Sequence, residues 1–139
     1  MGRSEEADKA VKKEQEQNNK MVLSTLTKTW IFDLDGTLVK HNGYKIDGHD
    51  TLLPGAKEYV DDIPSEDKIL ILTSRTDEYK NMTMDFLKKN EIRYDEILFN
   101  MPMGERIVVN DRKPSGIDMA VAINVDRDEP VFPTIQREF

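Results

Sequence analysis

The sequence contains no cysteine. This lack excludes disulfide bonds, thiolate zinc sites and cysteine nucleophiles, and it fits a reducing compartment. The sequence also has no apolar stretch long enough to cross a bilayer, and its first residues have no apolar core of the kind found in secretion signals. These features predict a cytoplasmic protein that does not bind membranes.

A basic excess is lacking as well. The chain carries 20 Lys and Arg residues against 27 Asp and Glu residues, a formal net charge of -7. An acidic chain has no general affinity for nucleic-acid backbones, so we do not expect nucleic acid as a partner. Hydrophobic residues make up only 37% of the sequence, but its 139 residues match the length of one ordinary domain.

The first 20 residues differ in composition from the rest. Ten of them are charged, five with each sign, and very few are apolar. Such a segment cannot bury enough surface to offset the entropy lost on ordering. The sequence therefore predicts a flexible or frayed-helical tail over residues 1–20 and a single domain over residues 21–139.

Within that domain, short apolar runs alternate with helical patterns. Strands are predicted at residues 29–32, 68–72, 97–99, 106–109 and 121–125. Helices are predicted at residues 54–62 and 76–90, and residues 126–139 are expected to be extended or irregular. This alternation predicts an α/β sandwich with a mostly parallel sheet. Only residues 100–105 join the third and fourth predicted strands, which is short for a parallel crossover.

Polar side chains follow three of these strands at their carboxyl ends, where parallel α/β sheets bind ligands. They are Asp33 and Asp35 after the first strand, Thr73, Ser74 and Arg75 after the second, and Asn110, Asp111, Arg112 and Lys113 after the fourth. Because the carboxyl ends of parallel strands share one edge of the sheet, we expect these groups to converge there.

The strongest motif is the stretch Asp33–Thr37, which reads DLDGT. Asp33 and Asp35 are two residues apart on an extended segment, so both carboxylates can face one site. Two such groups repel each other unless a cation lies between them, and oxygen ligands suit Mg²⁺ beside a phosphate. Gly36 permits a sharp turn, and the Thr37 hydroxyl can hold the loop. An ordinary Asp-rich turn after a buried strand is the alternative.

The DLDGT stretch resembles the DxDGT signature of haloacid dehalogenase-like (HAD) phosphatases. The resemblance is to small members without a cap, similar to those linked to surface-polysaccharide biosynthesis. It implies a three-layer Rossmann-like sandwich with a mostly parallel sheet and no cap domain; the polar segment 39–53 is too short for a cap and is expected to form a flap. It also implies that Asp33 is the nucleophile that becomes an aspartyl phosphate. Asp35 would protonate the leaving oxygen, activate water and bind Mg²⁺ through its backbone carbonyl.

Two further stretches resemble motifs of the same family. Thr73 fits the hydroxyl that binds phosphate after the second strand, with Ser74, Arg75 and Gly36 as further substrate or phosphate contacts. Arg75 is equally plausible as an exposed partner of a nearby acid. The pair Asn110-Asp111 resembles the acidic motif that completes Mg²⁺ coordination. The implied metal ligands are Asp33, Asp35, Asp111 and Asn110.

The family also requires a Lys or Arg that pairs with the nucleophile and the transferred phosphoryl group. The loop at residues 100–103, where compact members often carry it, reads NMPM and contains no cation. The candidates are Lys113, Arg112 and Arg106. Lys113 is favoured because it lies on the loop that already carries Asp111.

The resemblance therefore predicts a Mg²⁺-dependent phosphatase that hydrolyses a phosphate monoester, with a sugar or small polyol phosphate as the expected substrate. Two alternatives remain open. Met101 at the expected cation position and Asn110 in the acidic pair favour a degenerate HAD module that binds a phosphorylated ligand or a protein partner without turnover. An open site without a cap is also compatible with a protein phosphatase. Homo-oligomerisation is left open.

Overall fold

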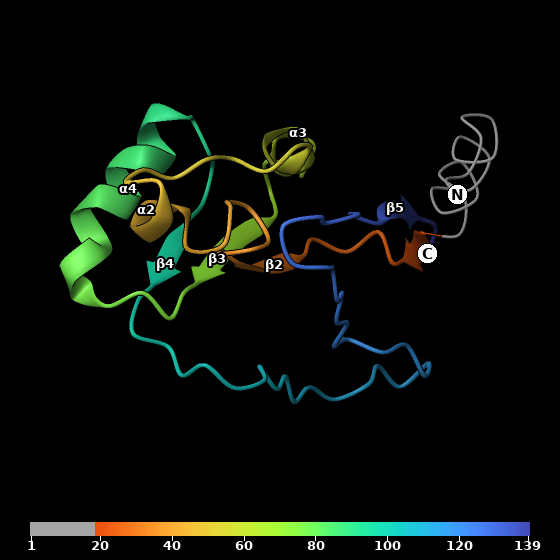
Figure 1. Ribbon diagram of the computed structural model, residues 1–139. Helices are drawn as coiled ribbons and strands as arrows, with labels where there is room; N and C mark the ends of the chain where they lie inside the picture. Colours follow the sequence, from red (N-terminus) through yellow and green to blue (C-terminus); the bar gives the residue numbers. More distant parts are fainter. Residues whose placement is uncertain (1–18) are drawn as a thin grey trace, which may run out of the picture.

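The computed structural model of the protein describes residues 19–139. Apart from Asn19 and Lys20, the predicted tail lies outside the described residues, and Lys20 already begins the first strand. The fold is a mixed α/β arrangement of two small parallel sheets and a few short helices (Figure 1). The expected α/β class with parallel pairing is confirmed at this level.

The larger sheet contains three parallel strands. They are β2 (Thr29–Asp33), β3 (Lys68–Leu72) and β4 (Glu96–Leu98), in the order β2-β3-β4. Asp33 pairs in register with Leu72, so β2 and β3 end at the same edge of the sheet. The first two predicted strands are confirmed, and the third begins one residue earlier than predicted.

Helices cover one face of this sheet (Figure 1). They are α2 (Gly43–Ile46), α3 (Ala56–Asp61), the 3₁₀ helix η1 (Asp77–Tyr79) and α4 (Lys80–Lys89). Both predicted helices are confirmed, although the second begins with η1 as its first turn. No helix of residues 19–139 is long and apolar enough to cross a bilayer.

The hydrophobic core lies between this sheet face and the helices. Successive strand residues point to opposite faces, so Ile69 and Ile71 of β3 are buried together. Leu87 of α4 packs into the same cluster. Complete burial of Ile71 and Leu87 contributes about 1.5–3 kcal/mol for each side chain. The face turned away from the helices leaves Ile31 and Leu98 exposed, so the described residues form two layers here, not the three that the resemblance implies.

The second sheet joins the two ends of the described chain. β1 (Lys20–Leu23) pairs in parallel with β5 (Thr134–Arg137). Tyr59 of α3 links this sheet to the core, because its ring stacks on Phe132 at 4.6 Å and its hydroxyl donates a 2.7 Å hydrogen bond to the Pro133 carbonyl. Burial raises the pKa of Tyr59 to about 12, so this hydroxyl stays a donor at neutral pH.

The predicted strands at residues 106–109 and 121–125 are wrong. Both stretches lie in the long irregular segment between β4 and β5, and Ile107 and Val109 are exposed. A β-branched run favours an extended backbone, but a strand also needs a partner strand. The six-residue connection at 100–105 is too short for an ordinary parallel crossover, which explains why local propensity did not produce a strand.

Candidate functional site

The candidate site begins with a tight turn at the carboxyl end of β2. The Leu34 carbonyl accepts hydrogen bonds from the backbone N–H groups of Leu38 and Val39, at 2.9 and 3.1 Å. Gly36 has a φ of +83°, in the left-handed region that favours glycine, and its N–H donates to the Val39 carbonyl at 2.7 Å. This turn carries Asp35 away from β2 and toward the helices.

Residues 126–129 support the turn from outside. The backbone N–H of Asp128 donates to the Gly36 carbonyl at 2.9 Å, and the Asp128 carboxylate accepts a 2.7 Å hydrogen bond from the backbone of His41. A Cβ atom on Gly36 would lie 3.0 Å from the Cγ atom of Arg127. Both backbone polar groups of Gly36 are thus used within the protein.

We expect Gly36→Ala to lower the free energy of unfolding by about 2 kcal/mol or more, because alanine is strained at this φ and its Cβ crowds Arg127. Gly48→Ala is a matched control, since Gly48 has a φ of +79° and no atom lies within 4 Å of the position that a Cβ would occupy there. That control should lose only about 1 kcal/mol. Urea unfolding measures both values, and equal losses would show that the Arg127 contact contributes nothing.

Asp33 is the last residue of β2, and its side chain is 39% exposed. One carboxylate oxygen accepts a 3.0 Å hydrogen bond from Nη1 of Arg106, and the other accepts a 3.3 Å hydrogen bond from the Thr37 hydroxyl. Arg106 is one of the three residues that the sequence offers as the cation beside the nucleophile. Lys113, the favoured one, forms no ion pair with Asp33 in the described part of the chain.

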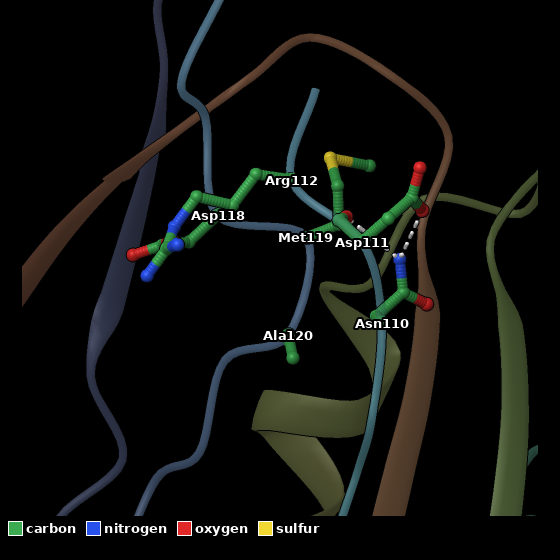
Figure 2. A pocket seen from close by; sticks show the side chains of 6 residues that line it. All are labelled: Asn110, Asp111, Arg112, Asp118, Met119 and Ala120. Atoms are coloured by element: carbon green, nitrogen blue, oxygen red, sulfur yellow. Dashed lines mark hydrogen bonds and ion pairs between the residues drawn. The ribbon is translucent and has the colours of Figure 1, made fainter. Parts of the chain in front are cut away.

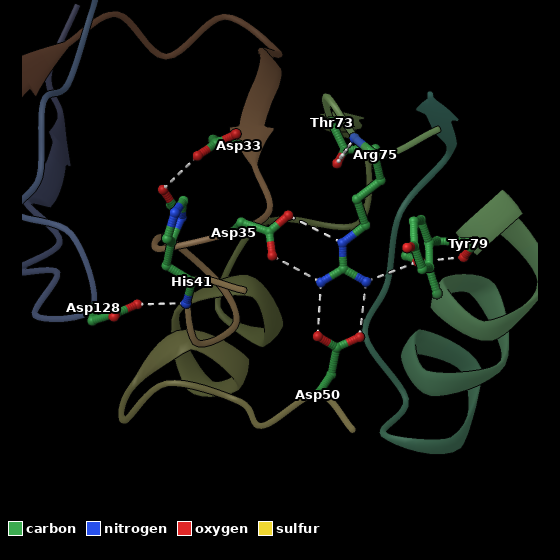
Figure 3. Close-up of polar contacts among 10 residues, drawn as sticks. Asp33, Asp35, His41, Asp50, Thr73, Arg75, Tyr79 and Asp128 are labelled. Atoms are coloured by element: carbon green, nitrogen blue, oxygen red, sulfur yellow. Dashed lines mark hydrogen bonds and ion pairs between the residues drawn. The ribbon is translucent and has the colours of Figure 1, made fainter. Parts of the chain in front are cut away.

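Asp35 belongs to a separate and more buried cluster with Arg75 and Asp50. Arg75 donates to both oxygens of Asp35, at 3.0 and 2.9 Å, and to both oxygens of Asp50, at 2.9 and 2.7 Å. Figure 3 shows the guanidinium lying between the two carboxylates. The side chains of Arg75, Asp50 and Asp35 are 1%, 2% and 17% exposed, so this is a largely desolvated triad.

Arg75 has no donor left for a substrate in this arrangement. Its fifth N–H contact is a 2.9 Å hydrogen bond to the Thr83 hydroxyl, and its guanidinium carbon lies 3.9 Å from the centre of the Tyr44 ring. Burial by itself would lower the pKa of Arg75, but the hydrogen bonds that it donates to Asp50 and Asp35 outweigh burial and raise the pKa. The guanidinium of Arg75 is therefore permanently charged.

Thr73 and Ser74 follow β3 at the same edge of the sheet. Thr73 is buried, and its hydroxyl accepts a 3.1 Å hydrogen bond from the backbone N–H of Arg75. Its carbonyl accepts a 3.0 Å hydrogen bond from Met101. Ser74 is exposed, and its hydroxyl lies 3.5 Å from the Pro102 carbonyl. The loop after β4 thus packs against this strand end.

Asn110, Asp111 and Lys113 lie on the irregular segment between β4 and β5. An open pocket with a volume of about 490 Å³ lies there. Figure 2 shows the side chains that line it, which are those of Asn110, Asp111, Arg112, Asp118, Met119 and Ala120. Asn110 donates to the Asp111 carboxylate at 3.3 Å. Lys113 is exposed and begins a backbone turn that Ile117 closes. None of these side chains shares a hydrogen bond or ion pair with Asp33 or Asp35 among the described residues.

The expected magnesium ligands are therefore not brought together. Over residues 19–139, no group of three or more His, Asp or Glu side chains is arranged to hold a metal ion. Asp111 lies with Asn110 in the open pocket, and both oxygens of Asp35 are bound by Arg75. The donor set in this arrangement does not fit Mg²⁺, so the chemistry below is assigned to the chain's own side chains.

Sequence reasoning missed three residues that shape the site. Asp50 and Tyr44 lie in the polar flap at residues 39–53, and Asp128 lies in a stretch expected to be irregular. The flap is closed at its base by a 2.9 Å hydrogen bond from Lys40 to the Thr51 carbonyl, and this closure brings Asp50 to Arg75. A lone acid in a polar loop carries no local signal of a buried ion pair.

Searches against protein-family models, curated proteins and solved structures found no match to this chain. The resemblance to HAD phosphatases consequently rests on the motif residues, and function has to be argued from the geometry of the site.

Proposed function

We propose that the protein is a phosphomonoesterase in which Asp33 is the nucleophile, similar to the small capless HAD phosphatases. One observation carries this proposal. Asp33 is an accessible carboxylate at the carboxyl end of a parallel strand, and Arg106 lies 3.0 Å from one of its oxygens. A carboxylate is a competent nucleophile at phosphorus when neighbouring cations neutralise the phosphoryl oxygens.

The proposed reaction has two half-reactions. First, a carboxylate oxygen of Asp33 attacks phosphorus while the bond from phosphorus to the ester oxygen breaks. The ester oxygen leaves with the electron pair and takes the proton of the Asp35 carboxyl group, the role that the resemblance assigns to Asp35, which leaves Asp35 as a carboxylate. Second, water attacks the phosphorus of the aspartyl phosphate and gives its proton to Asp35. The bond to Asp33 then breaks, which releases inorganic phosphate and restores the carboxylate.

The surroundings of each side chain support these roles. Arg106 is half-exposed, so it can turn from Asp33 to the oxygens of a bound phosphoryl group. The Thr37 hydroxyl holds the second oxygen of Asp33 and leaves the first for attack. Each oxygen of Asp35 has a second lone pair beyond the one used by Arg75, which suits a base that accepts a proton from water.

The finer features of the resemblance belong to this proposal. They are a Rossmann-like fold without a cap domain, a cytoplasmic location and a small phosphorylated metabolite, such as a sugar or polyol phosphate, as substrate. The order β2-β3-β4 in one parallel sheet supports the fold, and the exposure of Asp33 supports a site open to small esters. The resemblance also implies Mg²⁺, although the arranged side chains do not form a ligand set for it.

A panel of phosphate esters tests the function directly. The purified chain is incubated with aryl, sugar and polyol phosphates and with phosphopeptides, in parallel samples that contain Mg²⁺ or EDTA. We expect release of inorganic phosphate from at least one class, and an acid-quenched sample should carry a phosphoryl group on Asp33 in peptide mass spectrometry. No release from any class in either condition would refute the proposal.

A non-catalytic binding module is the second candidate. It is favoured by the separation of Asp111 from Asp33, because the implied metal set is incomplete without Asp111. This candidate predicts that a phosphate ester binds in calorimetry while the panel shows no hydrolysis. Release of phosphate that is lost in Asp33→Asn would exclude it.

The identity of the catalytic cation gives a separate prediction. We expect Arg106→Ala to lower kcat/KM about 10- to 100-fold, because it removes the positive charge beside the nucleophile. Lys113→Ala should change kcat/KM less than about twofold, since Lys113 is exposed and forms no ion pair with Asp33 in the described chain. This order reverses the preference for Lys113 drawn from sequence. Steady-state kinetics with the best substrate measure both variants. A larger fall in kcat/KM for Lys113→Ala than for Arg106→Ala would favour Lys113 as the catalytic cation.

A further inference from the structure

Asp50 is a buried carboxylate that has no role of its own in either of the two proposed half-reactions. It lies on the flap, 2% exposed, and both of its oxygens are bound by Arg75, at 2.9 and 2.7 Å. The same guanidinium binds both oxygens of Asp35. Asp35 and Asp50, which are fifteen positions apart in the sequence, thus both bind the guanidinium of Arg75. Figure 3 shows this arrangement.

The triad is poorly explained as a device for stability. Removing charged groups from water costs several kcal/mol per ion, and buried ion pairs often stabilise a fold no better than apolar residues of similar size. A guanidinium that binds two carboxylates, each through two hydrogen bonds, instead fixes the orientation of the three groups relative to one another. Asp50 and Thr83 hold one edge of the Arg75 plane, and the Tyr44 ring packs against its face at 3.9 Å. With its plane held in this way, Arg75 can present its remaining two N–H groups to Asp35 in only one orientation.

We propose that Asp50 is a positioning residue that acts through Arg75 to fix the carboxylate of Asp35 for water activation. This inference rests on the proposed phosphatase function. In the second half-reaction, Asp35 must receive a proton from water while that water attacks the aspartyl phosphate at Asp33. An error of about 1 Å in the position of a catalytic group can cost about 100-fold in rate. Asp50 does not touch the substrate. It holds the carboxylate of Asp35 in the position from which it can accept a proton from water.

Asp50→Asn is the sharpest variant, because an asparagine keeps the size of the side chain and changes its bonding. Its oxygen accepts from one Arg75 N–H, while its NH₂ group meets the other N–H as a second donor. Arg75 should then shift and carry Asp35 with it. Asp47→Asn is the matched control, since Asp47 lies on the same flap and forms a surface ion pair with Lys40 at 2.9 Å.

Rapid mixing with 2,4-dinitrophenyl phosphate isolates the step concerned. This leaving group needs no proton, so formation of the aspartyl phosphate does not depend on Asp35, whereas its hydrolysis does. For Asp50→Asn we expect a burst of about one dinitrophenolate per enzyme molecule, followed by a steady rate about 10- to 100-fold below that of the unmodified chain. Asp47→Asn should match the unmodified chain in both phases.

Other outcomes separate the inference from the function on which it rests. A proportional fall of burst and steady rate in Asp50→Asn indicates a loss of folded enzyme and overturns the positioning role, as does an unchanged steady rate. In both cases, turnover that Asp33→Asn abolishes leaves the phosphatase proposal intact. No turnover by the unmodified chain on any ester would overturn both.

A second pair of variants covers the case in which Asp50→Asn does not fold. Thr83→Val removes the hydroxyl that accepts from Arg75 at 2.9 Å, and Thr83→Ser retains it. We expect Thr83→Val to show the same retained burst with a smaller fall in the steady rate, and Thr83→Ser to restore it. Identical behaviour of the two variants would overturn the positioning role.

Discussion

Asp33→Asn is expected to lower kcat/KM for a phosphate monoester by at least about a thousandfold. An amide oxygen is a far weaker nucleophile than a carboxylate oxygen, so the aspartyl phosphate should not form. The fold should remain intact, because the side chain is 39% exposed and lies outside the hydrophobic core. Steady-state phosphate release and mass spectrometry of the acid-quenched protein measure both consequences.

The matched control for this variant is Asp85→Asn on α4. Asp85 is exposed and takes no part in the hydrogen bonds that hold Asp33, Asp35 or Arg75, so its replacement should leave kcat/KM within about twofold. Retention of phosphate release by Asp33→Asn at the rate of this control would show that another group attacks phosphorus. The assignment of Asp33, and with it the resemblance to the family, would then be wrong.

Arg75→Met should destabilise the fold strongly. It removes the one cation between Asp35 and Asp50 and leaves two poorly solvated carboxylates next to each other. Removing one partner from a buried ion pair typically costs about 3–5 kcal/mol. We therefore expect a loss of this size in the free energy of unfolding, measured by urea denaturation at neutral pH.

Two further variants test whether the two unpaired carboxylates cause this loss of stability. Arg112→Met breaks an exposed ion pair with Asp118, in which Arg112 is 75% exposed, and should cost less than about 1 kcal/mol. Adding Asp50→Asn to Arg75→Met removes one of the two stranded charges and should recover part of the stability. A loss from Arg75→Met no greater than that from Arg112→Met would mean that the triad contributes little to the folded state.

The helices and strands that were predicted correctly are those whose form is set by residues close together in the sequence. β2 and β3 are short continuous apolar runs bounded by polar residues, and the helix at α4 has apolar residues at helical spacing, so their form follows from local sequence pattern. The turn after Asp33 is of the same kind, because Gly36 alone permits its left-handed backbone.

The errors concern contacts between segments that are far apart in the chain. Residues 106–109 have the composition of a strand, but pairing requires a partner edge that a short connection did not reach. Proximity to Asp111 in sequence favours Lys113 as the cation, which stays a prediction, and the path of the backbone brings another candidate, Arg106, to Asp33.

Residue order therefore specified the acidic, hydroxyl and basic groups available to a site and the strand and turn that present Asp33, since both depend on side-chain type and short-range geometry. Folding decided which groups meet. Arg75 was equally suited to a substrate anion or a surface acid, and closure of the flap instead brought it Asp50 and enclosed both away from water. The burial that makes this pairing strong arises from packing between distant segments, and no local pattern encodes it.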